Sequence, residues 1–177
     1  MTDTKFKIRT ALKEEYSKIG QLMASVYSQL EGFPDKNEQP TYYTMLENVG
    51  DLTSKPKTEL IVAVSSESKL MGAVVYFGDM SSYGSGGLAP QEKKAAGFRL
   101  LAVDSKYAGK GIGKALSLFC IAKAKKAGLD RMIIHTTKAM PIAWKMYEKI
   151  GFLREGKLDF KQGALQVYGF SLRLHNL

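Results

Sequence analysis

The stretch from Leu101 to Leu116, LAVDSKYAGKGIGKAL, decides how this chain folds. Its first residues continue a hydrophobic run from Phe98 that is typical of a strand. Gly109, Gly111 and Gly113 then alternate with larger residues, and a helical pattern begins near Gly111. Glycine is costly in regular structure unless the backbone must turn sharply or a ligand must come close. The pattern therefore predicts a strand, a tight glycine turn and a helix, with a ligand approaching the turn.

A glycine turn that opens a helix can bind anions. The first N–H groups of a helix lack partners inside it, and the helix dipole adds partial positive charge there. The phosphate loop G-x4-G-K-[ST] does not match, because Ala108 and Ala115 replace its first glycine and its hydroxyl residue. The dinucleotide pattern G-x-G-x-x-G differs from the G-x-G-x-G spacing of this turn. Taken alone, the stretch leaves two interpretations, a cradle for another phosphate ligand or a turn that only closes tightly.

Working outward, hydrophobic periodicity predicts alternating strands and helices in the order β-α-α-β-β-β-α-β-α-β-β. The predicted strands are 6–12, 59–66, 69–79, 98–104, 130–137, 152–160 and 164–174, and the helices are 13–30, 41–50, 111–127 and 140–150. A long Gly/Ser-rich segment, 80–97, is expected to be a functional loop. The last two strands are expected to be antiparallel. We expect an α/β (α+β) fold with a mixed, mostly antiparallel central sheet and about four flanking helices.

Composition bounds the class of protein. The 177 residues suit a single domain, 1–177, with a real core. No apolar run has the length of a membrane span, and the N-terminal residues lack the apolar core of a signal peptide. Together with one cysteine, Cys120, this predicts a cytoplasmic protein without disulfides. Two histidines and one cysteine, widely separated, predict no metal site.

The formal net charge of +9 favours anionic partners. The basic residues are scattered, and the densest cluster, Lys123, Lys125 and Lys126, is expected to be a solvated helix face. No basic stripe alternates with aromatic residues, which argues against a nucleic-acid partner. A basic RNA- or ribosome-associated module stays open as a competing interpretation, and it predicts steeply salt-dependent binding.

Two motifs together resemble a known family. LAVDSKYAGKGIGKAL is similar to the acetyl-coenzyme A binding motif of the GNAT superfamily of N-acetyltransferases, a strand followed by R/Q-x-x-G-x-G/A and a helix. Downstream, AWKMYEKIGF, residues 143–152, resembles the family pattern A-x-x-x-Y-E-K-x-G-F. The order of the predicted elements also matches this fold over essentially the whole chain. The resemblance implies transfer of an acetyl group from acetyl-CoA to a primary amine by direct attack in a ternary complex.

The resemblance also implies roles for individual residues. The strand at the turn would lie along the pantetheine arm, the turn would hold the pyrophosphate, and the downstream helix would line the coenzyme. The implied coenzyme-binding residues are Leu101, Ala102, Val103, Ala108, Gly109, Lys110, Gly111, Ile112, Gly113, Lys114, Ala143, Trp144 and Tyr147. Tyr147 would also act as the general acid that protonates the leaving thiolate.

The chain departs from the family pattern at two functional positions. Ala108 stands where the family usually carries Arg or Gln, which removes a side chain that clasps the phosphates. Arg99 stands at about the position where many members carry a catalytic Glu. The general base is therefore open among Glu92, Glu31 and His135, with an ordered water or an amine that arrives neutral as alternatives.

Substrate residues are harder to read from sequence. Arg99 would repel a polycationic amine and favour an acceptor that carries a carboxylate. Tyr83 and Tyr42 are candidate wall residues of the acceptor site, which 30–44 and 78–97 should frame. Two further functions stay open, a coenzyme-binding domain without turnover and a protein or ribosome-associated Nα- or lysine acetyltransferase. The last strands of such folds can pair across a dimer, so a homodimer is also left open.

Overall fold

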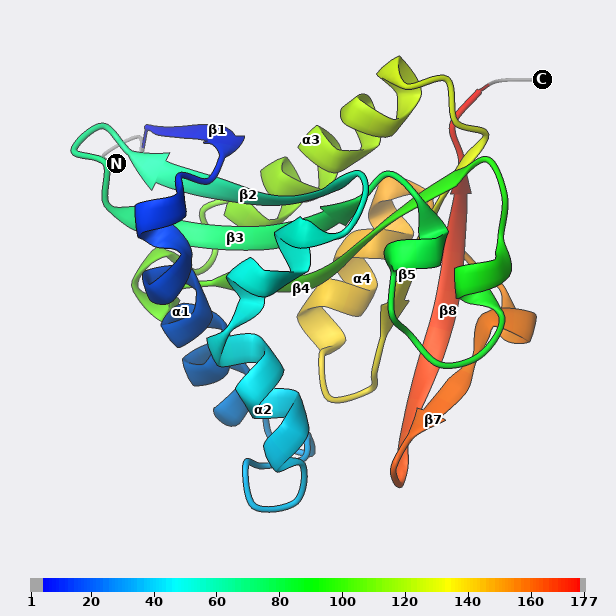
Figure 1. Cartoon of the computed structure of the whole chain (residues 1–177), viewed down its shortest axis with the longest axis horizontal. Coiled ribbons are helices and arrows are strands. Elements are labelled where there is room, and N and C mark those ends of the chain that lie inside the picture. The colour runs from blue at the N-terminus through cyan, green and yellow to red at the C-terminus, as the bar shows by residue number, and fades with distance from the viewer. Residues whose placement is uncertain (1–4, 176–177) are drawn as a thin grey trace.

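The computed structural model describes residues 5–175. Figure 1 shows a twisted sheet with helices on both faces, α1 and α2 in front of it and α3 and α4 behind it. The strands are β1 Phe6–Thr10, β2 Thr58–Ser65, β3 Leu70–Phe77, β4 Ala95–Val103, β5 Arg131–Thr136, β6 Leu153–Arg154, β7 Phe160–Gln162 and β8 Leu165–Arg173. The α-helices are α1 Tyr16–Ser28, α2 Pro40–Glu47, α3 Ile112–Lys126 and α4 Pro141–Ile150. Short 3-10 helices are η1 Lys13–Glu15, η2 Val49–Ser54, η3 Met80–Ser82, η4 Ala89–Gln91, η5 Ser105–Tyr107 and η6 Gly156–Leu158.

The sheet has the strand order β1-β2-β3-β4-β5-β8-β6, and β7 also pairs with β8. Every neighbouring pair is antiparallel except β4 and β5, which run parallel. A parallel neighbour requires a crossover, and the chain makes it through α3. The mixed, mostly antiparallel sheet with its four α-helices confirms the predicted fold class.

Alternating side chains of the central strands pack into two hydrophobic cores, one on each face of the sheet. On one face Val62, Val75 and Phe77 pack with residues of α1 and α2. On the other face Val74 and Tyr76 pack with residues of α3 and α4. Because helices cover both faces of the sheet, the central strands are hydrophobic at nearly every position. Successive residues nevertheless point to opposite faces and so pack in different cores.

Several predicted boundaries are wrong, and the differences that matter most concern two strands. The segment 152–160 was expected to be one strand, but it contains the two-residue β6, the turn η6 and the first residue of β7. The order of elements therefore gains one strand. β4 also begins at Ala95, three residues before Phe98, where it pairs with β5. Small alanines and a glycine carry little strand signal, and only pairing with β5 makes them a strand.

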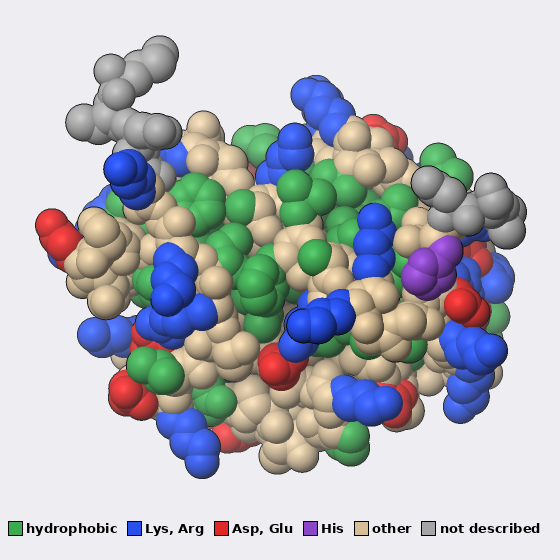
Figure 2. Space-filling model, turned by 90° about the horizontal axis from the view of Figure 1, so that it is seen from above, with side chains coloured by type: hydrophobic (Ala, Val, Ile, Leu, Met, Phe, Trp, Pro, Cys, Tyr) green, Lys and Arg blue, Asp and Glu red, His purple; other side chains and the backbone are tan. Residues whose placement is uncertain are grey.

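The surface charge is spread out. Figure 2 shows lysine and arginine side chains distributed among neutral and hydrophobic ones rather than gathered in one patch on the face that it displays. Within residues 5–175, none of the helices combines the length and the apolar character that a membrane crossing would need.

Candidate active site

β4 and β5 pair along only part of their length. Their parallel pairing runs from Ala95 with Arg131 to Gly97 with Ile133 and then ends. Beyond Gly97, β4 continues beside β3 while β5 continues beside β8. In the described part of the chain, the edge of β4 that faces β5 therefore has no strand partner from Phe98 to Val103.

A β-bulge bends β4 where this opening begins. The pairing with β3 jumps from Val75 and Arg99 to Ala73 and Ala102. Leu100 lies inside the bulge with φ of +60°, in the left-handed region that a leucine rarely adopts. The hydroxyl of Tyr27 in α1 donates a hydrogen bond to the carbonyl of Leu101 at 3.3 Å. The bulge therefore lies in the part of β4 that no longer pairs with β5.

The predicted glycine turn lies at the end of β4. Gly109 and Gly111 both have positive φ, +75° and +79°, and Gly111 is the N-cap residue of α3. A Cβ on either glycine would have no atom within 4 Å, so the space beside the turn is open. Helix geometry leaves the N–H groups of residues 112–114 without partners inside the helix. The turn therefore has the shape and polarity of an anion cradle.

A narrow cavity of about 90 Å³ occupies the opening between the strands, and we call it the inner cavity. Side chains from α1, α2, β4, β5, α4, β7 and β8 line it, and no Asp or Glu is among them. The predicted site residues that line it are Tyr42, Arg99, Leu101, His135, Ala143 and Tyr147. The fold thus brings together residues that lie up to 105 positions apart along the sequence.

Helix α4 presents one of its edges to the inner cavity. Ala143 and Tyr147, four residues apart, lie on that edge. Tyr147 is 5% exposed, and burial raises the pKa of its hydroxyl well above the usual value. Trp144 is directed elsewhere, since its ring packs edge-on against Tyr168 and Phe170. Tyr147 therefore faces the opening as a protonated hydroxyl, while Trp144 does not line the inner cavity.

His135 is held by a hydrogen bond at each ring nitrogen. Its Nε2 lies 2.8 Å from the carbonyl oxygen of Leu158, which can only accept, so Nε2 carries the proton. Its Nδ1 therefore accepts the hydrogen bond from the hydroxyl of Tyr83 at 3.0 Å. Burial lowers the pKa of His135 to about 4, so the ring is neutral at pH 7.

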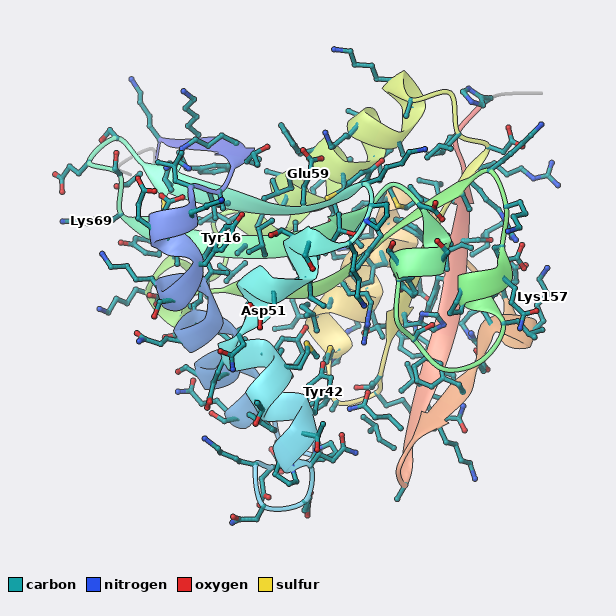
Figure 3. All side chains as sticks on the ribbon, in the orientation of Figure 1. Tyr16, Tyr42, Asp51, Glu59, Lys69 and Lys157 are labelled. Carbon is teal, nitrogen blue, oxygen red and sulfur yellow. The ribbon has the colours of Figure 1, made fainter. Side chains whose placement is uncertain are left out.

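The other two base candidates lie outside the inner cavity. Glu31 is exposed and does not line it. Glu92 forms ion pairs with Arg131 and Lys157. Burial alone would raise the pKa of Glu92, but hydrogen bonds from these two cations outweigh it and lower the pKa. In Figure 3, Lys157 lies at the right edge of the molecule, well away from Tyr42 on α2.

A second cavity of about 470 Å³, the outer cavity, adjoins the inner one. The two share Tyr42, Arg99, Phe160 and Gln162, among other wall residues. Tyr83 lines the outer cavity, and Arg99 donates a hydrogen bond to the carbonyl of Tyr83 at 2.8 Å. Burial raises the pKa of Tyr42 to about 12, so this wall hydroxyl also stays protonated. Arg99 and Tyr42 therefore reach both spaces.

Sequence reasoning missed two features of this region. Lys55, which follows η2, lines the outer cavity. Gln39 and Gln162 exchange hydrogen bonds across the cavity walls, Gln162 Nε2 to Gln39 Oε1 at 2.6 Å and Gln39 Nε2 to the Gln162 carbonyl at 3.1 Å. Neither a lone lysine nor two glutamines 123 positions apart gives a local sequence signal. Residues 5–175 also contain no group of three or more His, Cys, Asp or Glu side chains placed to hold a metal ion.

The chain belongs to the acetyltransferase (GNAT) family, whose model matches residues 21–152. That match spans the glycine turn, the opening between β4 and β5, and Tyr147. The predicted family resemblance is thereby confirmed.

Individual relatives share the fold or part of the sequence. An N-acetylaspartate synthetase from Xenopus tropicalis is 31% identical over 91 residues, which cover 48% of this chain and 34% of the relative. The aligned parts of the curated relatives make up only 19–34% of those proteins.

Solved structures agree over nearly the whole chain. A GNAT family acetyltransferase from Staphylococcus aureus Mu50 superposes with a TM-score of 0.73 at 16% identity and covers 97% of this chain and 100% of that one. The protein yncA from Salmonella typhimurium, solved with its cofactor acetyl-CoA, has a TM-score of 0.67 at 16% identity, covering 97% of this chain and 95% of that one.

Proposed function

We propose that this chain transfers the acetyl group of acetyl-CoA to a primary amine of a small molecule or peptide, by direct attack in a ternary complex. One observation carries the proposal. The unpaired edge of β4 begins at the inner cavity, which Tyr147 lines, and runs toward the glycine turn, where a Cβ on Gly113 would lie 3.8 Å from Leu101 and from Val103. A thioester ligand with a phosphate-bearing arm needs these features together. The relative solved with acetyl-CoA supports the same ligand.

The coenzyme side of the opening fits such a ligand. Gly109 and Gly111 leave the approach to the helix start clear, because a side chain there would occupy the open space. The backbone of Leu101–Val103 offers the edge of a strand to the amides of the pantetheine arm. Ala108 is exposed and contributes no side-chain donor, so positive charge would come from Lys110 and Lys114.

Tyr147 is the proposed general acid. Acetyl-CoA supplies the thioester, whose C–S bond breaks as the amine nitrogen forms a bond to the carbonyl carbon. The leaving thiolate must then gain a proton, and the amine must lose one. Tyr147 lines the inner cavity, and its raised pKa keeps the hydroxyl able to donate a hydrogen bond to the sulfur.

No strong base faces the reaction. The described residues that line the two cavities include no carboxylate, and both nitrogens of His135 are already bonded. We therefore propose that the amine arrives neutral or loses its proton to water. The α-amino group of a peptide, with a pKa near 7.7–8.0, is roughly one tenth neutral at pH 7, whereas a lysine side chain is only a few parts in ten thousand neutral. For an amine of higher pKa, loss of the proton to water is the route that we propose.

Arg99 is the proposed anchor for the acceptor. Its guanidinium borders both cavities, and no carboxylate within residues 5–175 forms an ion pair with it. A planar guanidinium binds a carboxylate through two parallel hydrogen bonds. A polycationic acceptor would meet repulsion there. The similarity to N-acetylaspartate synthetase, whose name denotes a carboxylate-bearing product, supports the same class of acceptor.

The test is release of the coenzyme thiol from acetyl-CoA across a panel of α-amino acids, polyamines, lysine derivatives and short peptides. We expect turnover with α-amino acids that carry a free carboxylate. Acetyl-CoA binding without turnover on any amine would instead support a non-catalytic coenzyme-binding domain. A strong preference for spermine would refute the role given to Arg99.

A further inference from the structure

The outer cavity is lined by cations that the chain itself does not neutralise. Lys55, Arg99 and Lys161 belong to its wall, and no Asp or Glu does. None of the three forms an ion pair with a carboxylate in the part of the chain that the structure describes. Some other cations of the chain do have such partners, for example Lys36 with Glu47 at 2.8 Å. The outer cavity is therefore a net positive space.

Two of these cations converge on one point. A Cβ built on Gly84 would lie 3.4 Å from Nη1 of Arg99 and 3.8 Å from Nζ of Lys55. Gly84 has φ of +74° and no side chain, so the space above it is left to the two cationic groups. Two like charges held close together repel each other, and a bound anion removes that cost.

The cations differ in which cavity they reach. Arg99 lines the inner and the outer cavity, whereas Lys55 lines only the outer one. Lys161 lies on β7 between Phe160 and Gln162, which line both cavities. Because neighbouring residues of a strand point to opposite sides, Lys161 is a rim residue rather than a second anchor. In an acceptor bound in both cavities, an anionic group next to the reacting amine can reach Arg99. A second anionic group further from the amine can reach Lys55.

We propose that the acceptor is a dianionic amine of the acidic amino-acid class, with its α-carboxylate on Arg99 and its second anionic group beside Lys55. The inference rests on the proposed acetyltransferase function and deepens it. The outer cavity, at about 470 Å³, leaves ample space for a short acidic side chain beyond the α-carboxylate. The positive charge of the outer cavity would favour an acidic amino acid over the corresponding side-chain amide, because the neutral amide leaves Lys55 without an ionic partner.

The experiment compares aspartate and glutamate with asparagine and glutamine, at saturating acetyl-CoA, for the native chain and for Lys55→Gln. We expect kcat/KM to favour the acidic acceptors about tenfold or more, as charge-assisted hydrogen bonds of ordinary strength would give. Lys55→Gln should erase most of this discrimination by raising KM for the acidic acceptors. Lys57→Gln is the matched control, because Lys57 is close in sequence but lines a different surface groove. It should keep the discrimination of the native chain.

The outcomes separate the two proposals. Absence of thiol release with every amine would refute the acetyltransferase function itself. Turnover that prefers the neutral amides, or that is insensitive to Lys55→Gln, would overturn the dianionic acceptor while leaving that function standing. A further test uses the native chain alone. Salt screens the attraction between exposed charges, so a KM for aspartate that does not rise with added salt would contradict the dianionic acceptor.

Discussion

The hydroxyl of Tyr83 lies 3.0 Å from Nδ1 of His135, and this hydrogen bond joins a wall residue of the outer cavity to one of the inner cavity. Tyr83 can donate this bond only while His135 is neutral, because a protonated ring has no lone pair at Nδ1. The carbonyl of Leu158 fixes the opposite nitrogen. His135 is therefore a positioning residue for Tyr83, whose carbonyl in turn holds Arg99.

The first prediction concerns stability and pH. The pKa of His135 is lowered to about 4 in the folded chain, against about 6.5 when unfolded, so the unfolded state binds more protons between these values. The neutral His135 therefore contributes up to about 3 kcal/mol to the free energy of unfolding above pH 6.5, and this contribution declines as the pH falls toward 4. Denaturant unfolding between pH 4 and 7 measures this slope. His135→Asn should be less stable at pH 7 and show a shallower slope, and an unchanged slope would contradict the assignment.

The second prediction concerns Tyr147. Tyr147→Phe removes only the hydroxyl, so we expect kcat to fall about 10²-fold or more while the Kd of acetyl-CoA stays near the native value. Isothermal titration and steady-state kinetics measure the two quantities. Tyr168→Phe, which alters a tyrosine packed on Trp144 outside the inner cavity, is the control and should keep the native kcat. A native kcat for Tyr147→Phe would reduce Tyr147 to a core aromatic residue.

The third prediction uses Gly111 and Gly128, the two glycines that flank α3. Gly111→Ala and Gly128→Ala each place a side chain at positive φ, +79° and +72°, and neither new Cβ meets an atom within 4 Å. Each should cost about 1 kcal/mol of stability through backbone strain. Only Gly111→Ala should also weaken acetyl-CoA binding, because only Gly111 borders the proposed pyrophosphate site. Equal coenzyme affinities for the two variants would argue against a cradle at the glycine turn.

The fourth prediction restores the family's usual side chain. Ala108→Arg adds a guanidinium at an exposed position beside the glycine turn, so we expect the Kd of acetyl-CoA to fall several-fold. Ala127→Arg adds the same charge at the exposed far end of α3 and should leave that Kd unchanged. An unchanged Kd for Ala108→Arg would indicate that Lys110 and Lys114 already supply the needed charge.

Much of the fold could be predicted because its signals are local. The runs of apolar residues, the glycine stop at Gly151 and the early Pro141 mark elements whose geometry depends on a few neighbouring residues. The strand boundaries near Ala95 and within 152–160 were wrong because pairing with distant strands decides them. The backbone of Leu100 was the least predictable feature, because leucine rarely adopts the left-handed conformation and no neighbouring residue indicates it.

The sequence by itself determined that a strand, a glycine turn and a helix follow one another around Gly111, and that Tyr147 lies in the second motif of the same family. Only the tertiary structure decided which side chains face that site. It paired Glu92 with Arg131, bonded both nitrogens of His135, and brought Lys55 and Arg99 over Gly84. The physical reason is range. A turn is encoded by neighbouring residues, whereas the electrostatics of a cavity depend on side chains that only the packed sheet brings together.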